Sequence, residues 1–585
     1  MDVRSLDETV KGLDGGIELL FKLGLFLVPP ALGERPHSGL NRLHVRLEFG
    51  VESLEFLRES TKFCRIGDGL GHDRPPEGFG KYRECTGKEV VTLPGTGFST
   101  LEKEVKMTEN NLINGQWVGS DSGATFEVHD PATGRVVGRV PDAGAAEARR
   151  AVDAAWNASS AWAGRPAIER AQMLQALSAR LAEDREDLAR LLTDEQGKPL
   201  AEARAEIDYA RSFFEVSAQA SALIRDETPS VPGKKIRVHR RPIGVAAAIT
   251  PWNFPIAMLA KKMAPAMAVG CTQVLKPAEQ TPLSAIALLE RAVASGVPAG
   301  VVNLVTGDPA AIGAAWLEDS RVRKFSFTGS TEVGRILMRG AATNLPRLSL
   351  ELGGHAPMIV FEDAAVDRAV EIAMAAKFRN GGQTCICPNR FLIHRSLHDD
   401  FVSKLANRSA ALTSGHGHDP EVVLGPMIDD AAIEKVEAHV ADAVEKGATV
   451  VTGGRRRRVE GFQDRFFEPT VLTGCTSHMR CWREETFGPV CPVRIFDDQA
   501  EALALANDSD FGLASYVVTN DEERIRRLGD ELRTGIIGVN DPGPAVAGVP
   551  FGGVKHSGFG REGGRWGLEE YLELVTVSAI DPASR

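Results

Sequence analysis

Residues 244–282 carry the pattern that decides the fold: GVAAAITPWNFPIAMLAKKMAPAMAVGCTQVLKPAEQTP. A short apolar run at 245–250 opens the stretch, a second run at 272–276 lies near its end, and a longer helical pattern lies between them. We predict two strands joined by a helix, because short apolar runs bounded by Gly and Pro are typical of buried strands. Such a unit implies parallel strands whose carboxyl ends carry the binding residues.

The same alternation continues toward the C-terminus. Further strand-like runs occur at 301–305, 324–328 and 358–361, with helical patterns between them. A second block of the same kind follows at about 364–551. The chain is therefore predicted to be an α/β protein with a doubly wound parallel sheet.

The chain between Met107 and this block is also patterned. Asn114-Gly115 separates two short β-prone runs and predicts a hairpin. Residues 145–161 and 167–183 show helical periodicity.

Composition excludes several classes of protein. The 585 residues carry a formal net charge of −11, whereas nucleic acids and anionic membranes attract basic proteins. The sequence contains no uninterrupted run of about 18 apolar residues, so we predict no membrane span. Eight cysteines without framework spacing favour a reducing compartment, so we predict a cytoplasmic location. His416 and His418 lie in a polar turn, and we predict no metal site.

Residues 1–106 differ from the remainder of the chain. They show no persistent period and match neither a secretory signal nor a transit peptide, because acidic residues interrupt both patterns. Residues 101–106 can be encoded by a purine-rich run that resembles a ribosome-binding site just before the codon of Met107. We therefore predict that 1–106 is a non-native or disordered extension that carries none of the function.

Two residues stand out as candidates for catalysis. Cys385 follows a polar, Gly-rich approach at 379–384, whereas structural cysteines are usually embedded among apolar residues. Glu351 lies inside an apolar, strand-like run, where burial raises the pKa of a carboxyl and suits it to act as a general base. A structural cysteine and a paired structural carboxylate are the alternatives.

Glycine-rich turns suggest where a phosphate would bind. The turn at 329–334 follows a predicted strand and opens a helix, so its free N–H groups suit a pyrophosphate; an ordinary capped turn is the alternative. The stretch at 558–563 matches GxGxxG but follows no strand, and we predict that it binds no dinucleotide. Asn253 and the Lys276–Glu279 stretch end two further strands, where Lys276 and Glu279 could bracket a ribose.

Taken together, these segments resemble the aldehyde dehydrogenase superfamily from about residue 112 to residue 580, and within it the succinate-semialdehyde dehydrogenases. Six segments agree in order: 251–255, 276–282, 329–334, 350–354, 382–385 and 484–489. The resemblance implies a Rossmann-type cofactor domain at 107–226 and 243–354, a catalytic domain at 355–556, and an oligomerisation ribbon at 227–242 and 570–582.

The resemblance also implies a role for each matching residue. Cys385 would attack the aldehyde, Asn253 would stabilise the oxyanion, and Glu351 would activate the water that hydrolyses the thioester. The cofactor would be NAD or NADP. Its contacts would come from Trp252, Asn253, Lys276, Pro277, Ala278, Glu279, Gly329, Ser330, Leu352, Glu485 and Phe487.

Two features of the sequence bear on the choice of cofactor and of substrate. A carboxylate at Glu279 would repel the 2′-phosphate of NADP, so we predict a preference for NAD. Arg379 and Lys261 would bind the far carboxylate of the substrate, although Lys261 replaces an arginine and residues 544–547 lack the expected serine. Succinate semialdehyde is therefore the first candidate, with glutarate semialdehyde and 2,5-dioxopentanoate as alternatives.

Three further expectations follow from the resemblance. We predict a homodimer or homotetramer that acts on a small aldehyde. A CoA-acylating enzyme and a non-catalytic protein are the rival interpretations, and Glu351 with Cys385 argues against both. Cys385 and Cys387 could form a strained, reducible disulfide, and a packing role for Cys387 is the alternative.

Overall fold

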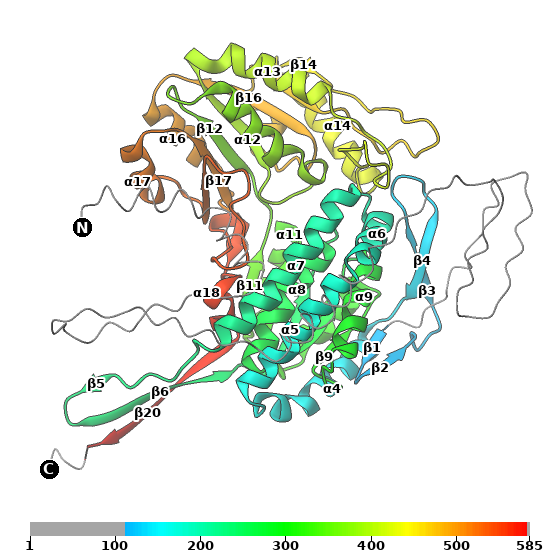
Figure 1. The fold of residues 1–585 in the computed structure, drawn as a ribbon, viewed down its shortest axis with the longest axis vertical. Coiled ribbons are helices and arrows are strands. Elements are labelled where there is room, and N and C mark those ends of the chain that lie inside the picture. The colour runs from blue at the N-terminus through cyan, green and yellow to red at the C-terminus, as the bar shows by residue number, and fades with distance from the viewer. Residues whose placement is uncertain (1–110, 582–585) are drawn as a thin grey trace, which may run out of the picture. The chain divides into compact units, whose positions relative to one another are not determined.

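The computed structural model describes residues 111–581, and the decisive stretch folds as predicted (Figure 1). Strand β7 (Val245–Ile249) pairs in parallel with β8 (Thr272–Lys276), so that Ile249 lies opposite Lys276. Helix α8 (Pro255–Val269) joins them. It starts at Pro255, whose fixed φ suits the first turn, and ends at Gly270, which has a φ of +99°.

The first sheet has eight strands in the order β19-β11-β10-β7-β8-β9-β1-β2. The five strands from β11 to β9 are parallel, and β19, β1 and β2 are antiparallel additions. The predicted hairpin at Asn114-Gly115 is confirmed. The remaining bounds are β1 (Asn111–Ile113), β2 (Gln116–Val118), β9 (Val302–Leu304), β10 (Val322–Thr328), β11 (Arg347–Glu351) and β19 (Gly558–Phe559).

Helices cover both faces of this sheet, because alternate residues of each strand point to opposite faces. In β7, Ala246 and Ala248 join the core under one group of helices, whereas Val245, Ala247 and Ile249 join the core under the other. The first group is α5 (Ala167–Glu183), α6 (Arg185–Gln196), α7 (Leu200–Ser221), α8 and α9 (Pro282–Ala294). The second group is α4 (Ala145–Ala163), α10 (Pro309–Glu318) and α11 (Thr331–Ala341).

The predicted second α/β block forms a seven-stranded sheet in the order β14-β15-β16-β13-β12-β17-β18, parallel except at β14. Its strands are β12 (Ala356–Val360), β13 (Pro388–His394), β14 (Thr449–Thr452), β15 (Thr470–Thr473), β16 (Val490–Phe496), β17 (Ala514–Val518) and β18 (Ile536–Val539). Its helices are α12 (Val366–Phe378), α13 (His398–Ala410), α14 (Asp430–Glu445), α15 (Arg480–Arg483), α16 (Gln499–Asn507) and α17 (Glu522–Glu531).

A long ribbon extends from the first sheet (Figure 1). Strand β6 (Lys234–Pro242) pairs with β20 (Leu572–Ile580) along its whole length, and β5 (Ser230–Val231) adds a third strand. On β20, Leu574 and Val577 are 64% and 56% exposed. The two segments predicted to form a ribbon therefore do pair, although their role in oligomerisation stays a prediction. The remaining elements are β3 (Thr125–His129), β4 (Val136–Pro141) and α18 (Gly564–Glu569).

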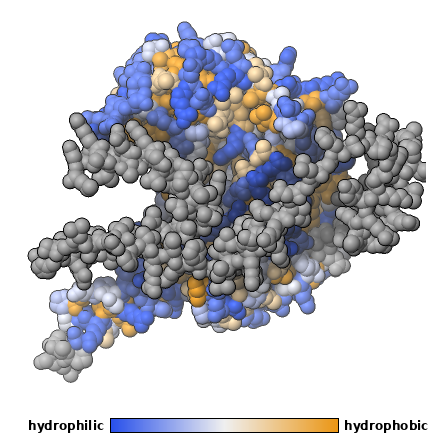
Figure 2. All heavy atoms as spheres, viewed as in Figure 1, coloured by the Kyte–Doolittle hydropathy of each residue, from blue (hydrophilic) through white to orange (hydrophobic). Residues whose placement is uncertain are grey.

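The surface seen in Figure 2 is mostly hydrophilic, with scattered hydrophobic residues. Within the described part of the chain, no helix is both long and apolar enough to cross a membrane. Residues 1–110 and 582–585 lie outside the described residues, so the predictions about the N-terminal extension and Met107 lie outside them too. The predicted domain boundaries stay predictions.

Candidate active site

A cavity of about 600 Å³ opens beside the carboxyl ends of β7, β10 and β11 and is closed on its other side by loops of the second sheet. This is the edge at which the sequence predicted a site. Nine of the predicted site residues line it: Trp252, Asn253, Gly329, Ser330, Leu352, Arg379, Cys385, Glu485 and Phe487. The others, which do not line it, are Lys261, Lys276, Pro277, Ala278, Glu279 and Glu351.

Cys385 reaches the cavity through an unusual backbone turn. Asn380, Gly381 and Gly382 have φ values of 51°, 63° and 78°, so three successive residues adopt the left-handed conformation that favours glycine. A Cβ on Gly354 would lie 2.0 Å from the carbonyl oxygen of Cys385. The loop that follows β11 therefore passes directly against the cysteine, and only glycine fits at that point.

Asn253 is held by a network that sequence analysis did not find. Its Nδ2 donates to the carbonyl of Gln383 at 2.9 Å, which leaves the second amide hydrogen available. The backbone carbonyl of Asn253 accepts from Lys198 Nζ at 2.8 Å. The same Nζ lies 2.5 Å from a carboxylate oxygen of the buried Glu206. Glu206 lies far from Asn253 in sequence, so no local pattern signals this support. The side-chain amide of Asn253 is therefore held against the carbonyl of Gln383, two residues before Cys385.

Opposing effects act on the Cys385 thiol. Burial raises the pKa of Cys385 to about 12, and the carboxyls of Glu485 and Glu351 act in the same direction. The ammonium of Lys261 and the guanidinium of Arg379 lower this pKa. The cations expected near a reactive cysteine are present, but the effect of burial outweighs them, so the pKa of the thiol lies above its ordinary value.

Glu351 ends strand β11 and is 2% exposed. Among the described residues, neither of its carboxylate oxygens has a hydrogen-bond partner. Burial and the nearby carboxylate of Glu562 hold the pKa of Glu351 well above its usual range. The expected direction of the shift is thus confirmed, although the side chain turns away from the cavity, toward Gly552 and Arg561.

The loop at 484–489 closes the other side of the cavity. Glu485 Oε1 accepts from the backbone N–H of Gly354 at 2.8 Å, and burial raises the pKa of Glu485 to about 7. Phe487 has a φ of 57°, which is uncommon for a bulky residue. Its ring meets the ring of Trp252 edge to face, with 5.5 Å between the centroids.

The segments predicted to bind a phosphate and a ribose follow the carboxyl ends of β10 and β8, and both binding roles stay predictions. Ser330 caps helix α11 by accepting from the N–H of Val333 at 3.3 Å, which leaves other N–H groups of the first turn free. Lys276 Nζ pairs with the partly exposed carboxylate of Glu279. The stretch at 558–563 supplies strand β19, which runs antiparallel to β11, and the short helix α18 follows it.

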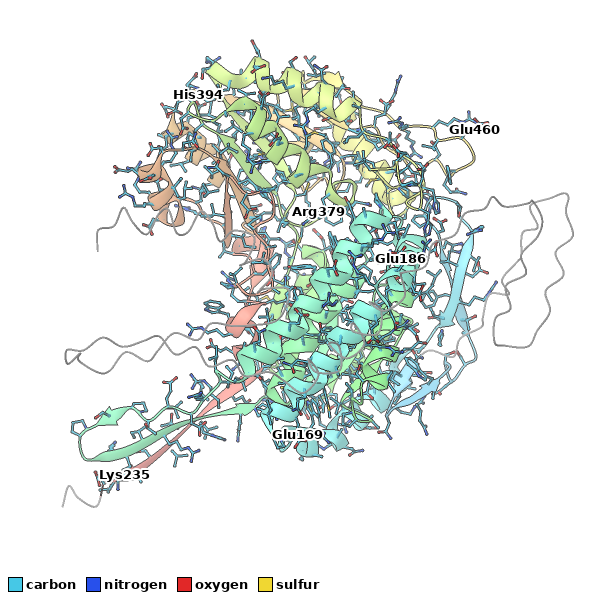
Figure 3. The ribbon with its side chains drawn as sticks, in the orientation of Figure 1. Glu169, Glu186, Lys235, Arg379, His394 and Glu460 are labelled. Carbon is cyan, nitrogen blue, oxygen red and sulfur yellow. The ribbon has the colours of Figure 1, made fainter. Side chains whose placement is uncertain are left out.

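In Figure 3, Arg379 lies where the helices of the first sheet meet the α/β block of the second sheet, and it lines the cavity. Its guanidinium lies 5.5 Å from the ring centre of Phe254, and it makes no hydrogen bond or ion pair with any residue in 111–581. Lys261 lies elsewhere: it is 1% exposed, with Nζ 3.3 Å from Glu562 Oε2. The structure therefore brings Arg379, but not Lys261, to the cavity with Cys385.

Cysteine and histidine chemistry elsewhere is limited. The six described cysteines are all free. Cys387 is buried with its Sγ 3.5 Å from the carbonyl of Lys377, and its disulfide with Cys385 stays a prediction. His416 and His418 pair with Asp130 and Asp194. No group of three or more metal-ligating side chains occurs within residues 111–581.

Comparison with known proteins identifies the family. Residues 117–577 match the model of the aldehyde dehydrogenase family. A succinate-semialdehyde dehydrogenase of Escherichia coli, named for NADP⁺, is 48% identical over 80% of this chain and 98% of its own length. A glutarate-semialdehyde dehydrogenase of Pseudomonas aeruginosa is 49% identical, over 81% and 98%. The crystal structure of a succinate-semialdehyde dehydrogenase from Burkholderia pseudomallei is 47% identical, with a TM-score of 0.80 over 82% of this chain and 100% of that chain.

The chain thus belongs to the aldehyde dehydrogenase family and has its fold, as the sequence predicted. It is an NAD(P)-dependent enzyme that oxidises an aldehyde.

The contact between Gly354 and Cys385 gives the first prediction. Gly354→Ala should lower kcat/KM for aldehyde oxidation by about 100-fold or more, because a 1 Å displacement of a reacting group costs about that much. The measurement is the steady-state rate of NADH formation. Gly529→Ala is the matched control, since open space surrounds that position in α17, and it should leave the rate unchanged. A Gly354→Ala enzyme with the normal rate would contradict the contact's importance.

Proposed function

We propose that this protein oxidises an anionic semialdehyde, with succinate semialdehyde as the first candidate, to the corresponding acid with NAD as the preferred cofactor. The observation that carries the proposal is the guanidinium of Arg379, which lines the same cavity as Cys385 and makes no hydrogen bond or ion pair within residues 111–581. The Arg379 side chain is exposed, with the ring of Phe254 beside it, so its guanidinium can bind a carboxylate ligand through two hydrogen bonds.

Cys385 is the proposed nucleophile. After it loses its proton, its sulfur forms a bond to the aldehyde carbon, and the carbonyl oxygen becomes an oxyanion. The free amide hydrogen of Asn253 and the backbone N–H of Cys385 are the proposed donors to that oxygen. One such donor typically contributes about 3–4 kcal/mol. The support that Lys198 and Gln383 give to Asn253 keeps this donor in place before the substrate arrives.

Glu351 is the proposed general base for the second half of the reaction. Once hydride has left the carbon, the product is a thioester on Cys385. Glu351 then takes a proton from water, the hydroxide oxygen bonds to the acyl carbon, and the carbon–sulfur bond breaks to release the acid. In its ionised form, a carboxylate with a raised pKa is a stronger base than a free carboxylate and takes up this proton more readily. Transfer to coenzyme A would need no such base, so Glu351 favours hydrolysis.

The residues at the strand ends fit a nicotinamide dinucleotide. The free N–H groups at the start of α11 suit its pyrophosphate, and the carboxylates of Glu279 and Glu485 suit the hydroxyls of its two riboses. Lys276, Pro277 and Ala278 would complete the adenosine side, while Trp252, Leu352 and Phe487 would contact the nicotinamide side. When bound, the nicotinamide accepts the hydride from the aldehyde carbon.

We propose NAD as the preferred form because the partly exposed carboxylate of Glu279 follows strand β8, where we expect the ribose 2′-hydroxyl to bind. A carboxylate accepts hydrogen bonds from a hydroxyl and repels a 2′-phosphate. The E. coli relative is named for NADP⁺, so NADP is the competing assignment.

A cofactor exchange tests this assignment. The wild-type enzyme should have a higher kcat/KM with NAD⁺, and Glu279→Ser should raise the NADP⁺/NAD⁺ ratio of kcat/KM by about tenfold or more, because one like-charge repulsion is removed. Glu290→Ser, an exposed change on the neighbouring helix α9, should leave the ratio unchanged. A wild-type enzyme that uses NADP⁺ at least as well as NAD⁺ would contradict the role of Glu279.

Removal of the guanidinium tests the substrate class. Arg379→Ala should raise the KM for succinate semialdehyde by about 10–100-fold, since hydrogen bonds to a charged group contribute about 1.5–3 kcal/mol, and should change the KM for propanal little. Arg408→Ala, an exposed change on α13, is the control. An unchanged KM for succinate semialdehyde would overturn the proposal. In the wild-type enzyme, a higher kcat/KM for glutarate semialdehyde or 2,5-dioxopentanoate would replace the first candidate.

We also propose that the enzyme is a homodimer or homotetramer assembled through the β5–β6–β20 ribbon. Apolar side chains of β20 are exposed in the single chain and would be covered by a second copy. The free cysteines support the predicted cytoplasmic location.

A further inference from the structure

The turn that presents Cys385 is held by a distant helix. Asn380 has a φ of 51°, and residues with a Cβ adopt this conformation rarely and keep it where surrounding contacts hold it. Its side chain donates to the carbonyls of Asn253 and Gln383, at 3.1 and 3.3 Å. Its backbone N–H donates to Glu202 Oε2 at 2.8 Å, and Glu202 lies 178 residues earlier in the chain, on helix α7.

The start of α7 explains why the carboxylate of Glu202 is available for this bond. Glu202 is the third residue of the helix, where a glutamate typically accepts from the backbone N–H of the residue that precedes the helix. That residue here is Pro199, and proline has no N–H. The carboxylate therefore cannot close its own helix in this way and accepts from Asn380 instead.

The bonded N–H belongs to the peptide bond between Arg379 and Asn380. It therefore fixes the backbone from which the side chain of Arg379 extends, and also the first step of the turn that leads to Cys385. Glu202 itself lines the cavity together with Arg379 and Cys385. One hydrogen bond from α7 thus acts on both residues proposed to meet the substrate.

The same face of α7 supports the segment that carries Asn253. Glu206 lies four residues after Glu202, and residues at this spacing share one face of a helix. Glu206 accepts from the first N–H groups of α8 at 3.1 and 3.2 Å, and it pairs with Lys198, which holds the carbonyl of Asn253. Two successive turns of one helix therefore contact the two segments that would surround the aldehyde carbon.

We propose that Glu202 is a positioning residue whose carboxylate holds the peptide bond between Arg379 and Asn380. This bond places the Cys385 thiol against the aldehyde and the guanidinium of Arg379 against the far carboxylate of the substrate, and so rests on the proposed roles of both residues. The contact requires an acceptor oxygen and no charge. An amide in place of the carboxylate preserves it, whereas an apolar side chain leaves the N–H unsatisfied.

Hydrogen–deuterium exchange of the full chain tests the bond directly. Mass spectrometry with fragmentation of a peptide that covers residues 379–387 resolves the amide of Asn380, which should exchange slowly in the wild type. In Glu202→Leu this amide should exchange about tenfold faster or more, because it loses its acceptor. Glu202→Gln should keep the rate within about threefold of the wild type. Glu215→Leu is the matched control, since it removes a partly exposed carboxylate elsewhere on α7 and should leave the rate unchanged.

Steady-state kinetics of the same variants show whether the bond serves catalysis. Glu202→Leu should lower kcat by about tenfold or more for both propanal and succinate semialdehyde, because the reacting sulfur is displaced. It should also raise the KM for succinate semialdehyde alone by about threefold or more, because Arg379 moves with the same peptide bond. Glu202→Gln should restore both constants to within about threefold of the wild type, and Glu215→Leu should leave them unchanged.

Three results would overturn the proposal: an unchanged exchange rate in Glu202→Leu, a faster exchange rate with an unchanged kcat, or a loss in Glu202→Gln as large as in Glu202→Leu. If Glu202→Leu does not fold, the wild type and Glu202→Gln decide, and rapid exchange of the Asn380 amide in either would contradict the bond. Exchange uses no aldehyde, and propanal has no far carboxylate. A wild-type enzyme without preference for anionic aldehydes would therefore overturn the proposed substrate class and leave these two measurements to decide the role of Glu202.

Discussion

The active site depends on the contact between the backbone of Gly354 and the carbonyl of Cys385. The tripeptide at 352–354 follows directly from Glu351 at the end of strand β11, so one short segment connects three parts of the site. Leu352 lines the cavity, a Cβ on Gly353 would lie 2.9 Å from Glu485 Oε2, and the N–H of Gly354 donates to Glu485. Gly353 and Gly354 allow the loop after β11 to pass close to Glu485 and to the backbone of Cys385, both of which lie in loops of the second sheet.

Buried charges surround this contact and hold its neighbours. Lys198 and Glu206 are both fully buried, and together they fix the backbone of Asn253 and the first turn of α8. Lys262 and Glu562 form a similar pair beside Glu351. Desolvation makes such pairs expensive, so they stabilise a fold little compared with apolar residues of the same volume. Their place beside Asn253 and Glu351 is consistent with a role in electrostatics rather than in stability.

Much of this arrangement could be predicted from the sequence, because its signals are local. The short apolar runs gave the strands of the first sheet, and Asn114-Gly115 gave the hairpin. Cys385 was identified because it follows a polar, Gly-rich segment, and Glu351 because it is a carboxylate inside an apolar run. The turn at 329–334 follows a strand and opens a helix, whereas the similar letters at 558–563 follow no predicted strand; the binding of a phosphate at 329–334 stays a prediction.

The side-chain contacts around the cavity could not be predicted, because they join segments that are distant in the sequence. Every residue of α8 is buried, so no periodicity shows that Lys261 faces Glu562 and the ring of Phe551 rather than the cavity. Lys198 and Asn253 are 55 residues apart, and no pattern links them. The pKa of Cys385 follows from the balance of burial against several charges, which only coordinates supply.

In the proposed reaction, Cys385 carries the acyl group and Glu351 activates the water that releases it. The most direct measurement is mass spectrometry of Glu351→Gln after incubation with succinate semialdehyde and NAD⁺. We expect one succinyl group on the peptide that contains Cys385, formed with one equivalent of NADH and absent from Cys385→Ala. Normal turnover by Glu351→Gln, or NADH formation with no acyl group on Cys385, would contradict it.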